Sequence, residues 1–365
     1  MIMKDIYYKR ITLILLIIFQ CYHLNAQEKL SKSIEKTYDF TNSGTLQLEN
    51  KYGNIIIDGW DQNKIAITIN ISVSKKEKDD AQELLDRIRP SISKTNSFIK
   101  IVSDIEEKNY SFFTRVFNSV NPFDFDKGNV QIDYKISLPI NAEIQLKNKF
   151  GDIIISEWDG KLTSDSQHGD MWINNDIINA NIKMTFGKLQ TKSISYGKVE
   201  LKNSEFDLQT SKNLRILSNG STINIEKVNQ LQLYSNKDKV FLGSIEKIKG
   251  ELKFSTVWLD NLINEIDLIM DVADFKVDKI TNPSANVDIN QKSSEINIDI
   301  SDLNFDFEAS LEQGLLRIPK TFKNIKNKMI DDKKRLREIQ GTYGSNLEKG
   351  IFKITGRKGV IILKE

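Results

Sequence analysis

The chain has 365 residues, of which 28% are charged, with 52 basic and 50 acidic side chains and a formal net charge of +2. This balance lacks the basic excess on which nucleic-acid binding depends, so we expect no nucleic-acid partner. One cysteine and two histidines exclude a disulfide framework and a histidine-rich metal site.

Residues 1–26 have the features of a secretory signal peptide. Three basic residues precede a nine-residue apolar run at 11–19, and Leu24-Asn25-Ala26 provides a cleavage site before Gln27. The run is much shorter than the roughly 20 residues that span a bilayer, so we expect no transmembrane segment. The sequence therefore predicts an exported protein that resides in the periplasm or on the outer cell surface.

Cleavage after Ala26 would also change the composition of the chain. It removes three of the 52 basic and one of the 50 acidic residues, which leaves 49 of each and a net charge near zero. The only cysteine, Cys21, leaves with the signal, and the residues before it are too large for a lipid-attachment motif. We expect a mature protein without thiol chemistry and without a lipid anchor.

Residues 27–143 are expected to form a β-rich N-terminal module with a single helix. Alternating apolar residues predict strands at 65–73, 97–102 and 130–138, whereas the apolar residues of 76–89 follow helical spacing up to Pro90. Because open strand edges invite aggregation, we expect the helix to cover an edge or an end of the β structure.

Between two of these strands lies an irregular aromatic segment, 104–129, which contains Phe112, Phe113 and Phe117. Two interpretations remain open. The segment either folds back over the module, or it protrudes and contacts a partner or a membrane surface through its aromatic side chains.

The strongest pattern in the sequence is an internal repeat. Residues 46–60 recur as 144–158, with apolar residues at offsets 0, 2, 9 and 11 from the start of each unit. Each half alternates with period two, which predicts two short strands, and the Tyr-Gly or Phe-Gly between them marks a bend.

The same template applies to ten consecutive units, with a spacing of 17 or 18 residues and one step of 21. The units start at residues 144, 162, 180, 197, 214, 231, 248, 266, 287 and 305. Of the 40 template positions 35 are apolar and none is charged, and a further match closes the chain at Phe352. Such units stack because one alone cannot exclude enough water, so we expect a β-solenoid of about ten rungs over 144–365, of undetermined handedness.

Three glycines 18 residues apart each follow a ring-bearing residue, namely Phe150, His168 and Phe186. We expect a column of rings beside a column of bends, and we interpret His168 as a stacked structural residue rather than a ligand or a catalytic group.

Residues 319–350 form an insertion with an excess of lysine and arginine. A charge run of this kind is usually a solvated helix or loop. Its alternative role is the binding of an anionic partner such as lipopolysaccharide or an acidic polysaccharide.

The outward positions at offset 10 include Trp172, Phe241 and Trp258, with polar residues between them. These rings are either covered by the module and the insertion, as hydrophobic burial would demand, or open to a glycan or a protein partner. We therefore take Trp172, Phe241, Trp258, Phe112, Phe113 and Phe117 as candidate partner-binding residues.

The Asn-Lys-Tyr-Gly-Asn-Ile and Asn-Lys-Phe-Gly-Asp-Ile units, with their trailing tryptophans and the long strand repeat, resemble the putative adhesin β-strand-repeat family of Bacteroidetes-type bacteria. That family includes the auto-transporter adhesin head (GIN) domains. The resemblance covers about residues 40–365 and implies a cell-envelope protein that binds a surface glycan or an envelope protein, with no catalytic residues to carry over.

The sequence also lacks the glycine-rich nucleotide turns, the nucleophile elbow and the calcium-binding aspartate ladder of familiar enzymes and cofactor proteins. We therefore expect no cofactor and a secreted, non-catalytic binding or structural protein. The alternatives are a periplasmic envelope or signalling component that binds a protein partner and, third, a carbohydrate-active β-helix enzyme.

Overall fold

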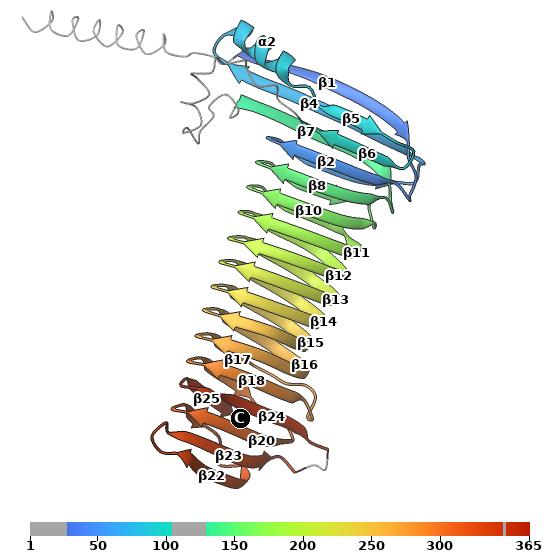
Figure 1. The fold of residues 1–365 in the computed structure, drawn as a ribbon. Helices are drawn as coiled ribbons and strands as arrows, with labels where there is room; N and C mark the ends of the chain where they lie inside the picture. Colours follow the sequence, from blue (N-terminus) through green and yellow to red (C-terminus); the bar gives the residue numbers. More distant parts are fainter. Residues whose placement is uncertain (1–27, 104–128, 346–347) are drawn as a thin grey trace, which may run out of the picture.

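The computed structural model describes residues 28–103, 129–345 and 348–365. The expected signal peptide at 1–26 and the candidates Phe112, Phe113 and Phe117 lie outside the described residues. The described chain is all-β, with 72% strand and one helix, and it forms a long, mostly parallel sheet that does not close on itself. The strands are stacked along one axis, so the molecule is a rod (Figure 1).

The body of the rod is built from the repeat units. The first half of each unit pairs in parallel with the first half of the next, as in Leu162 opposite Ile144, and the second halves pair in the same way, as in Val240 opposite Ile223. In the middle of the rod the second half of one unit and the first half of the next belong to one long strand, and at both ends of the rod the halves form separate strands. The long strands are β11 (Met171–Thr185), β12 (Lys188–Lys202), β13 (Glu205–Asn219), β14 (Thr222–Asn236), β15 (Lys239–Lys253) and β16 (Thr256–Asp271). The separate first halves are β2 (Thr45–Lys51), β8 (Glu143–Lys149), β10 (Lys161–Gln167) and β18 (Asn286–Lys292), and the second halves are β3 (Ile55–Trp60), β9 (Ile153–Ser156), β17 (Asp274–Val277) and β19 (Glu295–Asp299).

The template correctly predicts which side chains point inward. Every template position of the ten units is buried except Gly197, Gly250 and Leu316, which are half-buried. Ile223 and Val240, in the middle of the stack, have no exposed surface. The alternation of buried and exposed residues follows from the period of two along each strand.

The structure adds an inner column that the template does not contain. In five of the six long strands one more apolar residue turns inward at the bend that follows the second half of the unit, and in β13 the buried Ser211 takes this position. The apolar residues are Ile177, Ile194, Val228, Ile245 and Leu262, all almost completely buried. Ile194, Val228, Ile245 and Leu262 lie at offset 14, which the template does not include, and Ile177 lies at offset 15 beside a one-residue shift of the ladder between Ile173 and Asp176.

At the opposite bend the N-terminal units carry a glycine. Phe150, His168 and Phe186 have left-handed φ values of 57°, 56° and 56°, so the ring-bearing residue, and not the glycine after it, turns the chain. The glycine is needed for another reason, because a Cβ at Gly169 would lie 2.0 Å from the carbonyl oxygen of Gly151 in the preceding unit.

Small polar side chains form a ladder just after this bend in the middle of the rod. Each accepts a hydrogen bond from the backbone N–H of the corresponding residue one unit earlier: Ser221 from Ser204, Asp238 from Ser221, and Ser255 from Asp238, at 3.2, 2.7 and 3.1 Å. Asp238 is only 2% exposed, and this burial raises the pKa of its carboxyl group. Further hydrogen bonds offset part of the cost of burying this side chain, because its oxygens also accept hydrogen bonds from Ser235 and from the N–H of Asn236.

The N-terminal end departs from the parallel arrangement. Its strands are β1 (Glu28–Asp39), β4 (Lys64–Lys75), β5 (Ser91–Lys94), β6 (Phe98–Val102) and β7 (Val130–Pro139). Strands β6 and β7 continue the parallel stack above β2 and β3, whereas β1, β4 and β7 pair antiparallel. The expected helix is present as α2 (Lys78–Arg87), and it packs against β1 and β4 through Ala81, Leu84 and Leu85 (Figure 1).

The C-terminal end corrects the expected order of units. Its strands are β20 (Phe305–Glu312), β21 (Leu315–Arg317), β22 (Lys323–Asp331), β23 (Leu336–Tyr343), β24 (Gly350–Arg357) and β25 (Val360–Lys364). Strands β24 and β25, which end the chain, lie between β18 and β20 and between β19 and β21, so the unit expected at 305 does not stack on the unit at 287. Phe307 lies opposite Phe352, which shifts the start of that unit by two residues from Phe305.

The insertion 319–350 is not the solvated helix or loop that its charge suggests. Its central part is an antiparallel hairpin of β22 and β23, here called the basic hairpin, and β23 pairs with β20. The physical reason is the open edge of β20, whose backbone groups need partners. Ile339 and Tyr343 of β23 face inward and are buried beside that edge.

Candidate functional site

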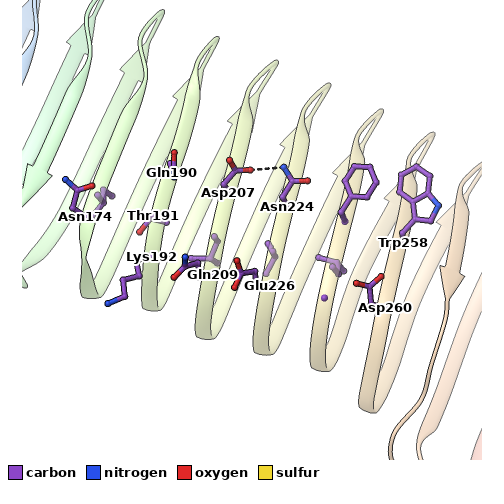
Figure 2. Close-up of a pocket in the computed structure, with 16 residues that line it drawn as sticks. Asn174, Gln190, Thr191, Lys192, Asp207, Gln209, Asn224, Glu226, Trp258 and Asp260 are labelled. Carbon is purple, nitrogen blue, oxygen red and sulfur yellow. Dashed lines mark hydrogen bonds between the residues drawn. The ribbon is translucent and has the colours of Figure 1, made fainter.

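An open groove runs along the outer face of the second half-strands, across β11 to β16. It has a volume of about 660 Å³, and its lining residues come from these six successive strands (Figure 2). Because outward residues of parallel strands in register align along the rod, the groove lining consists of rows of side chains that come from different units.

The central row, here called the outer column, contains the residues at offset 10. It runs in register through Trp172, Gln190, Asp207, Asn224, Phe241 and Trp258. The structure thus brings the sequence candidates Phe241 and Trp258 into the groove, together with the three polar residues. Trp172 is half-buried beside Ile154 at the next position of the column and does not line the groove.

The two aromatic residues of the groove form a stacked pair. The ring centroids of Phe241 and Trp258 lie 4.6 Å apart with an angle of 8° between the planes. Phe241 remains 42% exposed, and Trp258 is half-buried. The pair therefore presents apolar ring surface to solvent at one end of a polar groove.

The polar part of the outer column is cross-linked. Asn224 donates a hydrogen bond to Asp207 over 2.7 Å (Figure 2), and the ammonium group of Lys188 lies 2.6 Å from Asp207 and 2.8 Å from Glu205. The hydrogen bonds to Asp207 and Glu205, in that order, raise the pKa of Lys188 above its ordinary value. Lys188 is therefore held as a cation.

Sequence reasoning missed Lys188 and Glu205 because it considered only offsets 1 and 10 as outward positions. Both lie at offset 8, which has the same parity and therefore points to the same face of the strand. The alternation of inward and outward side chains along each strand would have been enough to identify Lys188 and Glu205 as neighbours of the outer column.

A second polar row borders the groove at offset 12 and contains Lys192, Gln209, Glu226 and Asp260 (Figure 2). Together with Gln190 of the outer column, these side chains offer amide, carboxylate and ammonium groups in two adjacent rows. Such groups bind hydroxyl-rich or polar ligands through several hydrogen bonds. Within the described ranges, no group of three or more metal-ligating side chains occurs.

A second aromatic surface, here called the ring column, follows the sharp bends of the N-terminal units. It consists of Tyr52, Phe150, His168 and Phe186, whose neighbouring rings stack at 5.6, 5.0 and 4.9 Å. His168 lies between two phenylalanine rings, as expected for a structural residue. This stacking offsets part of the strain of the left-handed residues, because each stacked pair contributes roughly 0.5–1.5 kcal/mol.

No described element is placed to cover the groove. The basic hairpin pairs with β20 at the C-terminal end of the rod, and α2 packs on β1 and β4 at the N-terminal end (Figure 1). Among the described residues, no helix is long and apolar enough to cross a membrane.

Comparison with protein-family models and with curated proteins finds no match. Several solved structures are similar to this chain, including those named as putative adhesins of Bacteroidetes. The one from Parabacteroides merdae ATCC 43184 is 9% identical, with 73% of this chain and 95% of that chain covered and a TM-score of 0.39. The one from Bacteroides fragilis NCTC 9343 is 16% identical, with coverage of 73% and 97% and a TM-score of 0.31. A structure named as a putative lipid binding protein, from Parabacteroides distasonis ATCC 8503, is 12% identical, with coverage of 73% and 96% and a TM-score of 0.33.

Proposed function

We propose that this protein is an exported, non-catalytic β-solenoid that acts as an adhesin and binds a glycan along the groove on its outer face. In this proposal residues 1–26 are a signal peptide, residues 27–143 cap one end, and residues 144–365 form the stack of rungs. The solenoid is supported by the spacing of paired residues in neighbouring strands, which is 17 or 18 positions in both halves of successive units.

The exposed aromatic pair beside aligned polar side chains is the observation that carries the glycan proposal. Phe241 and Trp258 offer apolar ring surface that can pack against the C–H groups of a sugar, while Gln190, Gln209 and Glu226 offer partners for its hydroxyl groups. The groove is long and shallow, and it follows the rod axis. This shape suits an extended chain better than a small molecule that must be enclosed.

The engagement of the charged groups favours binding over catalysis. Asp207 is held by Lys188 and Asn224, so its lone pairs are largely occupied by permanent partners. A general acid or base needs free access to the substrate, whereas these oxygens are already occupied by neighbouring side chains.

A direct test measures glycan binding by the mature protein and by single variants. Neutral and acidic polysaccharides are screened on an array, and the best ligand is titrated by calorimetry. We expect Trp258→Ala to weaken binding by about tenfold or more, since aromatic anchors dominate such interfaces.

The control is Phe254→Ala. Phe254 is 55% exposed and lies only four residues before Trp258, but it does not line the groove, so its removal should leave the affinity unchanged. Wild-type affinity in the Trp258 variant, or an equal loss in both variants, would refute the groove as the site. The location is tested separately by cell fractionation with surface protease, which distinguishes an outer-surface adhesin from a periplasmic component.

A further inference from the structure

The last strand of the rod, β22, has one open edge and two exposed faces. Among the described residues it pairs with β23 alone, and it lies at the outermost position of the C-terminal end (Figure 1). Its first eight residues are exposed and its last is half-buried. The N-terminal edge strand β1 differs, because α2 packs on it and Lys32 donates hydrogen bonds to the carbonyl oxygens of Leu85 and Ile88.

The charge of β22 is concentrated on a short stretch. Some exposed lysines along the body of the rod pair with carboxylates, as in Lys161 with Glu143 and Lys247 with Glu265. Lys323, Lys326 and Lys328 lie close together on one strand and make no ion pair with any described residue. Lysines on an edge strand often serve only to prevent strand pairing. That role alone does not account for the apolar residues on the same strand.

Ile325 and Met329 lie on the face of β22 opposite to Lys326 and Lys328, and a third apolar residue, Ile330, is 42% exposed near the end of the strand. Asn327 lies opposite Ile339, which is buried, so Asn327 and Met329 share the inner face. Ile325 lies on this face too, since its side chain is the neighbour of the position that a Cβ at Gly341 would take. Ile325 and Met329 nevertheless remain 50% and 46% exposed, because the opposite half of the stack ends before this level.

The lysines point the other way. Lys326 and Lys328 lie opposite Gln340 and Glu338, on the outer face of the hairpin. A flat membrane surface cannot contact both faces of a strand at once, whereas an added strand presents its own side chains alternately to both. A second copy of this chain does not fit either, because its β22 would place three more lysines against these.

We propose that β22 is a docking edge for an extended segment of another protein in which acidic and apolar residues alternate. The segment adds to the sheet as the next strand through backbone hydrogen bonds. Its acidic side chains lie beside Lys326 and Lys328, and its apolar side chains cover Ile325 and Met329 at the open end of the core. This edge is remote from the groove, so the inference does not depend on the proposed glycan site.

The test uses the mature protein and a nine-residue peptide that alternates glutamate and valine, with both ends blocked. Binding is measured by fluorescence anisotropy at low salt. We expect saturable binding that is lost when the peptide is N-methylated at every residue, because methylation keeps the side chains and removes the backbone donors. We also expect the double variant Lys326→Glu with Lys328→Glu to bind about tenfold or more weakly.

A matched double variant, Lys320→Glu with Lys333→Glu, makes the same change in net charge outside β22 and should keep the wild-type affinity. Trp258→Ala should also keep it, which separates this edge from the groove. An equal loss in both double variants, or undiminished binding of the methylated peptide, would reduce the interaction to unspecific charge attraction. Binding to phosphatidylglycerol vesicles without binding to the peptide would indicate a membrane surface instead, and dimers of the protein alone would indicate self-pairing. Each of these results would overturn the proposal.

Discussion

Asp238 offers a sharp test of how the interior of the rod is stabilised. It is the only charged residue in a ladder otherwise made of serines, and its carboxylate accepts three hydrogen bonds while almost completely buried. Two effects oppose each other there. Burial of the carboxylate destabilises the fold, and its hydrogen bonds stabilise it.

Replacement by alanine would leave two backbone donors, the N–H groups of Ser221 and Asn236, without their present acceptor. Each unpaired buried donor costs about 1–3 kcal/mol, and removal of the buried charge returns part of this. We expect Asp238→Ala to lower the free energy of unfolding by roughly 2–4 kcal/mol, which corresponds to a loss of roughly 3–6 °C in thermal midpoint for a protein of this size.

Asp238→Ser separates the two donors. A serine can accept the hydrogen bond from Ser221 in the way that Ser255 accepts one from Asp238 at 3.1 Å. Only the N–H of Asn236 then loses its acceptor, and Asn236 is half-buried, so water can replace the lost partner. We expect a loss of about 1 kcal/mol.

Unfolding by heat and by urea, followed by circular dichroism, measures both variants. The expected order of stability is wild type, then the serine variant, then the alanine variant. An alanine variant as stable as the wild type would refute this reasoning, because burial of the carboxylate would then outweigh all three hydrogen bonds.

Three further outcomes are expected. Burial raises the pKa of Asp238 above its ordinary value of 3.8, so the folded protein binds more protons than the unfolded chain in the window just above that value. The stability that this group contributes is therefore full below pH 3.8 and is lost as the pH rises through the folded pKa. The wild type should thus gain stability relative to Asp238→Ser as the pH is lowered from neutral toward 4, which urea unfolding at several pH values measures. Gly169→Ala should prevent close stacking, since its Cβ would meet a carbonyl oxygen at 2.0 Å, whereas Gly341→Ala, with its nearest atom at 3.4 Å, should melt near the wild-type temperature; equal melting of the two would contradict the close approach. Mass spectrometry of the exported protein should find Gln27 at the N-terminus, and a retained or lipid-modified Cys21 would contradict the signal-peptide prediction.

The groove was only partly visible in the sequence. Offset 10 alone identified Phe241 and Trp258 as outward rings, because parity decides which face a strand residue occupies. The contacts of Lys188 with Asp207 and Glu205 join residues 17 to 19 positions apart in the chain, across two turns of the stack. The alternation does not encode which side chains of neighbouring turns reach one another, so the contacts that hold Asp207 in the groove lining could be found only in the structure.

The alternation with period two and the spacing of 17 or 18 residues determined the strands, the inward residues and the parallel stacking of the central units. A strand with one buried face tolerates only one phase, and a shift by one residue would expose every apolar side chain. The order of the last units and the basic hairpin were decided only in the tertiary structure. The unit at Phe352 and the unit at Phe307 both present apolar inner faces that fit β18, and the pattern does not distinguish them. The position of β24 between β18 and β20, and the pairing of β22 with β23, depend on which strand edges are still unpaired when these segments join the sheet. An unpaired edge is a property of the assembled sheet and not of the local sequence.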